Sequence, residues 1–157
     1  MRRQEREVSD PERLAGILGR AVTAHVAFLD RGEPAVVPLS FGFEVRDGVF
    51  HFYFHGAAEG RKAECWRADP RVSASFVGTA EFVPGSPRCR STCLYESVIA
   101  SGNMECLTDL GEKIHALNRI MAHYGGESSG AFPAAALERT AVFHFAAASI
   151  SGKSNRL

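Results

Sequence analysis

Short apolar runs separated by turn residues recur along most of the chain. The first three such runs cover residues 22–29, 35–45 and 49–54. Asp47-Gly48 lies between the second and third runs and is typical of a two-residue hairpin turn, while the segment 30–34 is turn-like. The pattern therefore predicts a three-stranded antiparallel meander in the first third of the chain.

Three later runs have the same character and are also predicted to be strands. They cover residues 72–77, 94–106 and 140–150. The stretch from Gly78 to Cys89 is rich in proline and glycine, so it is predicted to be a loop or an irregular extension.

Helical periodicity is confined to short segments between these strands. Ser9-Asp10-Pro11 provides an N-cap and a first-turn proline for a helix ending near Arg20. Thr108-Asp109 caps an amphipathic helix farther along. Residues 59–68 have helical composition, and residues 133–137 predict one or two further turns.

A domain with about six short antiparallel strands tends to close into a barrel, because closure removes exposed sheet edges. The 157 residues suffice for one buried core and are few for two. We therefore predict a mainly β fold, a six-stranded antiparallel β-barrel with peripheral helices, forming a single domain over residues 1–157.

Charge and composition exclude several classes of partner. The chain has 18 basic and 18 acidic residues, so no net field draws it to nucleic acid or to an anionic membrane. The N-terminal residues are charged, and no apolar stretch approaches the length of a membrane span, so we expect a cytoplasmic protein. The four cysteines lack C-x-x-C spacing, so we expect free thiols and no metal site.

The segment from Phe52 to Lys62 is the most informative for function. A strongly apolar strand gives way to small residues, which are followed by a helix beginning with Arg61 and Lys62. Small residues allow backbone amides to approach a ligand, and the two cations suit a phosphate. The residues alone leave two interpretations open. The segment is either an anion-binding turn or an ordinary helix N-terminus whose cations are solvated.

Several motifs, taken in order, resemble those of one flavoprotein family. They are the segment 36–40 (VVPLS), the segment 52–62 (FYFHGAAEGRK), Asp69–Val72, Tyr95–Gly102 and Ser151–Lys153. Together they resemble the pyridoxamine 5′-phosphate oxidase-like, FMN-binding split β-barrel flavoproteins, with most similarity to the nitroimidazole-reductase branch. The resemblance spans almost the whole chain, and it implies a homodimer with FMN at the subunit interface.

The resemblance also implies which residues bind the cofactor. Arg61 and Lys62 would hold the FMN phosphate, and the turn of His55, Gly56 and Ala57 would follow the ribityl chain. The strand of Val37, Pro38, Leu39 and Ser40 would face the isoalloxazine ring. Ser97 would lie beside the phosphate, and Lys153 would reach the flavin of the partner subunit. No catalytic residue is assigned.

The sequence also departs from the family pattern. Glu96 places an acid near the predicted phosphate site, which would weaken FMN binding unless its side chain points away. Residues that bind pyridoxal phosphate in the true oxidases are not found before Leu157, so vitamin B6 oxidation is not predicted. The aromatic residues of 41–54 are expected in the core, with Phe41 as a candidate substrate wall, and Trp66 as a packing anchor.

Two functional hypotheses follow. The first is an FMN-dependent oxidoreductase that reduces a small nitroaromatic or quinone-like compound with electrons from a reduced nicotinamide. The alternative is a flavin- or haem-binding sensing or storage module without substantial turnover. Haem would require a histidine ligand, for which His25, His55 and His144 are the candidates.

Overall fold

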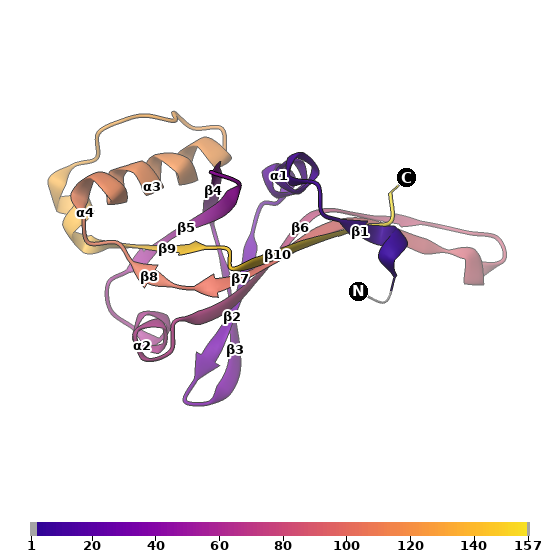
Figure 1. Cartoon of the computed structure of the whole chain (residues 1–157), viewed down its shortest axis with the longest axis horizontal. Helices are drawn as coiled ribbons and strands as arrows, with labels where there is room; N and C mark the ends of the chain where they lie inside the picture. The colour runs from indigo at the N-terminus through magenta and orange to yellow at the C-terminus, as the bar shows by residue number, and fades with distance from the viewer. Residues whose placement is uncertain (1–2, 157) are drawn as a thin grey trace.

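Two antiparallel sheets make up the framework of the computed structural model, which describes residues 3–156. Within these residues, the six-stranded sheet has the order β1-β10-β7-β6-β2-β3, and the four-stranded sheet has the order β4-β5-β9-β8. Figure 1 shows α3 lying across the smaller sheet and the β6–β7 ribbon extending away from the body. The structure confirms the mainly β, antiparallel split-barrel class expected from the sequence.

The strands are β1 (Glu7–Val8), β2 (Ala24–Asp30), β3 (Glu33–Leu39), β4 (Phe41–Arg46), β5 (Val49–Ala57), β6 (Arg71–Val83), β7 (Thr92–Asn103), β8 (Glu105–Cys106), β9 (Thr140–Ala146) and β10 (Ser149–Ser154). The helices are α1 (Pro11–Arg20), α2 (Arg61–Ala68), α3 (Leu110–His123) and α4 (Ala134–Arg139), with 3-10 turns η1 (Gln4–Arg6) and η2 (Arg88–Arg90).

Three of the predicted strands each divide into two strands that belong to different sheets. The run 35–45 becomes β3 and β4, the run 94–106 becomes β7 and β8, and the run 140–150 becomes β9 and β10. The predicted meander is therefore wrong, because β2–β3 and β4–β5 are separate hairpins in separate sheets. Side-chain alternation continues through the β3–β4 and β7–β8 junctions, so the pattern there gives no sign that the hydrogen-bonding partner changes.

Of the two alternatives for the segment after Gly78, the irregular extension is what the structure shows at its start. β6 continues to Val83, which pairs with Thr92 of β7, and Gly78 lies at a bulge between Val77 and Thr79. A Cβ atom at Gly78 would lie 2.6 Å from the carbonyl oxygen of Ile17 on α1. Glycine is therefore required here by the close approach of a helix, and not by a turn.

Aromatic side chains from both sheets fill the core. The ring of Phe52 stacks between Phe76 at 4.8 Å and Phe145 at 5.0 Å, measured between ring centroids. Phe41 is fully buried and packs 4.8 Å from Phe76, so the expectation that it forms a substrate wall is wrong. Burying each such side chain stabilises the fold by roughly 2–3 kcal/mol.

The helices start where their capping residues predict. Asp10 accepts a hydrogen bond from the amide of Arg13 at the start of α1, and Asp109 accepts one from Glu112 at the start of α3. Trp66 on α2 is buried between the edges of Phe28 in the larger sheet and Phe143 in the smaller sheet. The expected packing anchor is thus confirmed, and it fixes α2 between the two sheets.

None of the helices in residues 3–156 combines the length and apolar character required to cross a bilayer.

Two glycine substitutions test the approach of α1 to the β6 bulge. Gly78→Ala would press a methyl group onto the backbone of Ile17 and should lower the free energy of unfolding by about 1–3 kcal/mol. Gly19→Ala, on α1 itself, meets no atom within 4 Å and should be neutral or stabilising by up to about 1 kcal/mol. Urea denaturation of both variants measures the difference. Equal stability of the two would mean that α1 does not pack tightly at the bulge.

Candidate functional site

At the junction between β5 and α2, the N-terminus of the helix is not capped by any side chain. Gly60 is the N-cap of α2, has a φ of 112°, and leaves the helix without a side-chain cap. The amide of Glu64 donates to the carbonyl oxygen of Gly60 at 3.1 Å, so the amides that precede it in the first turn have no acceptor inside the helix. Such amides, together with the helix dipole, favour an anion.

Lys62 folds back over the end of β5. A Cβ atom at Gly56 would be 2.8 Å from the Lys62 Nζ atom, so the ammonium group occupies the space that a side chain at residue 56 would take. A cavity of about 320 Å³ adjoins the start of α2, and both Arg61 and Lys62 line it together with Val37 of β3. The structure thus brings together four predicted site residues, Val37, Gly56, Arg61 and Lys62.

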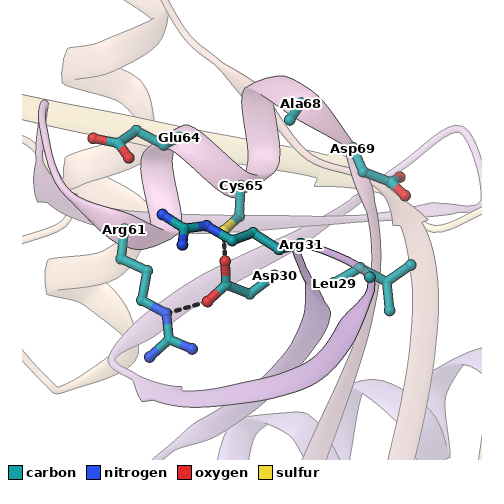
Figure 2. A pocket seen from close by; sticks show the side chains of 9 residues that line it. Leu29, Asp30, Arg31, Arg61, Glu64, Cys65, Ala68 and Asp69 are labelled. Atoms are coloured by element: carbon teal, nitrogen blue, oxygen red, sulfur yellow. Dashed lines mark hydrogen bonds and ion pairs between the residues drawn. The ribbon is translucent and has the colours of Figure 1, made fainter.

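Asp30 orients the guanidinium group of Arg61. The Nε atom of Arg61 donates to Asp30 Oδ2 at 2.5 Å, and the Cys65 thiol donates to Asp30 Oδ1 at 3.4 Å (Figure 2). These two hydrogen bonds, with that from Arg61 the stronger, hold the pKa of Asp30 below its usual value. The terminal nitrogens of Arg61 point away from Asp30 and stay free for a ligand.

The remaining residues predicted to face the ring lie on or next to the edge strand β3, and those predicted to form the turn lie at the end of β5. β3 is the last strand of its sheet, and Pro38 pairs with His25 there, at the kind of edge position where a strand tolerates proline. Leu39 pairs with Ala24, and Ser40 lies at the crossing from β3 to β4. His55 and Ala57, near the end of β5, are exposed.

Ser97 and Lys153 lie elsewhere in the same chain. They are register partners on β7 and β10, and β7 is separated from β3 by β6 and β2. Within one chain the structure therefore does not bring them to Arg61. The carboxylate of Glu96 pairs with Arg20 at 2.7 Å, so its charge is directed to α1.

Tyr95 lies beside this second group of residues. The Lys153 Nζ atom is 5.9 Å from the centroid of the Tyr95 ring. Burial alone would raise the pKa of Tyr95, but hydrogen bonds from Arg6 and Lys153 outweigh it and lower the pKa. Lys153 of β10 and Arg6 of η1 thus lie next to a phenol whose pKa they lower.

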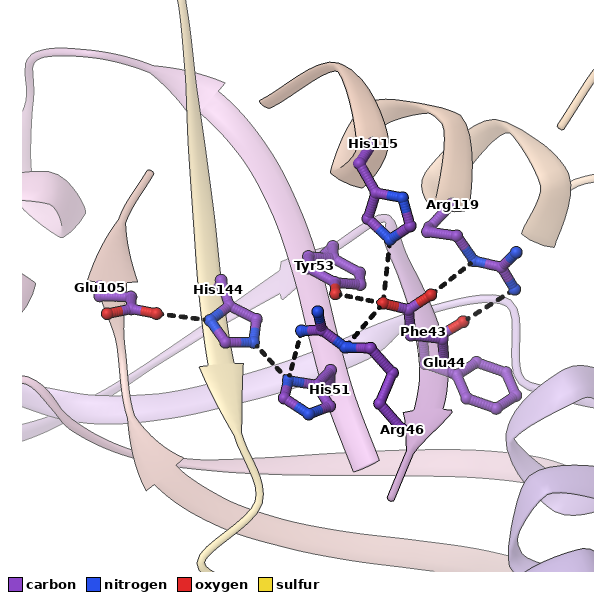
Figure 3. Close-up of polar contacts among 9 residues, drawn as sticks. All are labelled: Phe43, Glu44, Arg46, His51, Tyr53, Glu105, His115, Arg119 and His144. Carbon is purple, nitrogen blue, oxygen red and sulfur yellow. Dashed lines mark hydrogen bonds and ion pairs between the residues drawn. The ribbon is translucent and has the colours of Figure 1, made fainter. Parts of the chain in front are cut away.

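Sequence reasoning missed a polar network between the smaller sheet and α3 (Figure 3). Glu44 accepts hydrogen bonds from the Tyr53 hydroxyl at 2.7 Å and from His115 Nε2 at 2.9 Å. Although partial burial opposes it, these contacts lower the pKa of Glu44. Because Tyr53 is buried and faces that carboxylate, its pKa is raised far above the usual value. The network is built from residues up to 93 positions apart, so no local pattern indicates it.

His144 belongs to the same network and is poorly suited to bind haem iron. Its Nδ1 atom lies 2.6 Å from Glu105 Oε1, and its Nε2 atom lies 2.9 Å from His51 Nδ1. Both ring nitrogens are therefore engaged. His55 lines an apolar cavity of about 220 Å³ formed with α3 and α4, and His25 is exposed on β2. The described residues contain no cluster of three or more side chains placed to hold a metal ion.

Two histidines on α3 make specific contacts with neighbouring elements. His115 contacts Glu44, and the Nε2 atom of His123 donates to the carbonyl oxygen of Ala21 at 2.7 Å. The ring of His123 packs 4.3 Å from that of Phe41. Both side chains hold α3 against neighbouring elements.

Stability should depend on the protonation of His51. Burial, followed by the positive charges of Arg46 and His144, lowers its pKa from the ordinary 6.5. The unfolded chain then binds more protons than the folded chain below about pH 6.5, so the free energy of unfolding should fall as the pH falls through that window. His51→Gln should flatten this dependence between about pH 8 and pH 5.5. An unchanged slope in urea titrations of the variant would assign the dependence to another group.

The fold described above also occurs in proteins of known structure. A protein from Bacteroides thetaiotaomicron, proposed to confer 5-nitroimidazole antibiotic resistance, superposes with a TM-score of 0.82 at 28% identity, covering 94% of this chain and 85% of its own. A FAD-binding protein from Mesorhizobium loti superposes with a TM-score of 0.65 at 26% identity, covering 96% and 98%. A FAD- and haem-binding protein from Mycobacterium smegmatis shares the fold with a TM-score of 0.78 at 20% identity, covering 96% and 74%.

Sequence comparison gives the same result. None of the curated proteins is significantly similar to the chain. The model of the pyridoxamine 5′-phosphate oxidase family matches residues 10–154, which is nearly the full length. The chain therefore belongs to the pyridoxamine 5′-phosphate oxidase family, whose members bind flavins on a split β-barrel.

Proposed function

We propose that the protein is a flavin-dependent oxidoreductase that holds the phosphate of an FMN group at the β5–α2 junction. The observation that carries the proposal is the convergence of three kinds of donor there. They are the unpaired amides of the first turn of α2, the ammonium of Lys62 above Gly56, and the terminal nitrogens of Arg61. A phosphate is the ligand that such a set suits.

The ring of the flavin would extend from this junction along β3. Val37 lines the cavity beside Arg61, and Pro38, Leu39 and Ser40 follow it along the edge strand. An edge strand leaves backbone groups open to a ligand, and proline keeps another strand from adding there. These features support the assignment of Val37–Ser40 to the ring.

A second copy of the chain would complete the site. The outer face of the larger sheet carries exposed apolar side chains beside Ser97, including Val77 at 46% exposed and Ile99 at 51% exposed. Apolar side chains gathered on one sheet face favour association with another protein surface. A twofold pairing through this face would give Ser97 and Lys153 a role in the partner's flavin site, which they cannot reach in their own chain.

When bound, the flavin would supply the redox chemistry, accepting a hydride from a reduced nicotinamide and passing two electrons to a small oxidised acceptor. The residues of the chain would bind the flavin and orient it. Asp30 would hold the guanidinium group of Arg61 in place, and Lys62 would neutralise the phosphate. β3 would lie along the ring. The similarity at 28% identity to the 5-nitroimidazole resistance protein supports a nitroaromatic or quinone-like acceptor. The second candidate is a flavin-holding module without turnover.

Removing the guanidinium group of Arg61 should weaken phosphate binding specifically. Arg61→Ala should reduce FMN affinity by about 2 kcal/mol, or roughly 30-fold, because a charge-assisted contact is lost. Riboflavin lacks the phosphate, so its affinity should not change. Calorimetric titration with both ligands makes the comparison, with Arg88→Ala on the distant β6–β7 loop as the control. A similar loss for both ligands would show that Arg61 supports the fold.

Turnover separates the enzyme from the storage module. The flavin-loaded protein should oxidise a reduced nicotinamide when a nitroaromatic or a quinone is present, and should sediment at twice the 17.0 kDa mass of one chain. Absorbance of the nicotinamide measures the rate. A dimer that holds flavin and gives no turnover with either acceptor would favour storage or sensing.

A further inference from the structure

At the crossing from β3 to β4, the chain leaves the larger sheet for the smaller one. The ladder between β2 and β3 extends as far as the pair of Ala24 and Leu39 and then stops. In the same register, Val22 would lie opposite Phe41 two positions farther along. Phe41 instead pairs with Phe54 of β5. The feature that ends the β2–β3 ladder therefore determines where β3 stops and β4 begins.

Val22 and Phe41 lie at a position where an antiparallel ladder would form a direct backbone hydrogen bond. Hydrogen-bonded and non-hydrogen-bonded pairs alternate along such a ladder. Because Pro38 has no N–H group, its pair with His25 takes a non-hydrogen-bonded position. The position of Val22 and Phe41 is the third pair beyond it and is therefore a hydrogen-bonded one. The amide of Phe41 would there donate to the carbonyl oxygen of Val22.

The hydroxyl group of Tyr124 lies between these two backbone groups. The amide of Phe41 donates to Tyr124 Oη at 3.1 Å, and the hydroxyl donates to the carbonyl oxygen of Val22 at 2.7 Å. Both backbone groups thus keep a hydrogen-bond partner, although the two segments do not bond to each other. The Tyr124 hydroxyl holds the segments apart and sets the distance between them.

Tyr124 is held in place by the end of α3, which meets the crossing beside β4 (Figure 1). It is the C-cap of α3, and its amide donates to the carbonyl oxygen of Met121 at 3.1 Å. The ring of His123 packs 4.9 Å from the ring of Tyr124 and 4.3 Å from that of Phe41. His123 also bonds to the carbonyl oxygen of Ala21, next to Val22. The hydroxyl is therefore positioned by a packed helix.

Ser40 is the residue that this arrangement places most directly. It lies between Leu39, the last paired residue of β3, and Phe41, whose amide is bonded to the Tyr124 hydroxyl. A shift of the Phe41 backbone would therefore move Ser40, which ends the segment proposed to face the flavin ring. Displacements of about 1 Å are enough to weaken a binding or catalytic site.

We propose that Tyr124 is a positioning residue for the flavin ring, because its hydroxyl keeps the β3–β4 crossing open and thereby places the backbone of Ser40. The inference rests on the proposed function, since it assumes that the ring lies along Val37–Ser40. Tyr124 acts through the backbone. Its effect is therefore expected at the ring, and not at the phosphate that Arg61 and Lys62 would hold.

Tyr124→Phe tests the proposal, because it removes only the hydroxyl group of a side chain that is 44% exposed. Riboflavin and FMN affinity should both fall about 10-fold in calorimetric titration, since the ring is common to the two ligands. The visible circular dichroism of the bound flavin should also change, because it depends on the surroundings of the ring. Tyr53→Phe is the matched control. It removes a hydroxyl bonded to Glu44, leaves the crossing intact, and should change neither quantity.

A measurement on the wild type does not depend on the folding of any variant. If the crossing positions the ring, binding of the ring must in turn stabilise the crossing, because coupling between two sites is reciprocal. Hydrogen exchange of the Phe41 amide, followed by NMR, should therefore slow about 10-fold when riboflavin is bound.

The outcomes separate this proposal from the proposed function. Wild-type affinities and dichroism in Tyr124→Phe, a loss confined to FMN, an equal loss in Tyr53→Phe, or unchanged exchange of the Phe41 amide would each overturn the positioning role. All four leave the flavin function intact. If the wild type binds neither riboflavin nor FMN at micromolar concentration, the proposed function fails and the positioning role fails with it.

Discussion

The contact between Asp30 and Arg61 determines how the candidate site can work. It joins the tip of the β2–β3 hairpin to the first turn of α2, two elements 31 residues apart. Arg61 is 74% exposed in its side chain, and an exposed ion pair adds little to stability. The main effect of the ion pair is therefore to orient the Arg61 guanidinium group. With Asp30 ionised, Arg61 and Lys62 together leave one net positive charge facing the ligand, supplemented by the helix amides.

Packing in the core of the barrel holds the elements that carry Asp30 and Arg61 in place. Trp66 packs on Phe28 of the larger sheet and on Phe143 of the smaller sheet, so α2 cannot shift relative to either. The stacked rings of Phe52, Phe76 and Phe145 join the two sheets behind it. A loop-to-helix junction is thereby presented by a packed core, which is the arrangement that precise ligand positioning requires.

Local features could be predicted from the sequence, and long-range ones could not. Asp10 and Asp109 cap their helices as expected. The expected turn at His55, Gly56 and Ala57 is wrong, because these residues still pair with β9 as the end of β5, and the chain leaves the sheet only at residues 58–60. The crossings between sheets were missed because apolar alternation continues through Ser40 and Met104 while the pairing partner changes. The same limit applies to the site.

In the sequence, Asp30 has the pattern of an ordinary turn residue. No neighbouring residue indicates that it forms a hydrogen bond with Arg61. Glu44 likewise reads as a solvent-facing strand residue, although it accepts hydrogen bonds from Tyr53 and His115. The predicted roles of Ser97 and Lys153 depend on a second chain, so no inspection of one chain decides them. Contacts between distant elements and between subunits are set by tertiary and quaternary packing.

The central claim is that the β5–α2 junction holds a flavin phosphate while a second subunit closes the site. A crystal structure of the protein grown with flavin tests it most directly. The account predicts a dimer in which a phosphate lies within hydrogen-bonding distance of Arg61 and Lys62, with the ring along β3 and against the partner subunit. A flavin bound elsewhere, or a phosphate held without either cation, would contradict it.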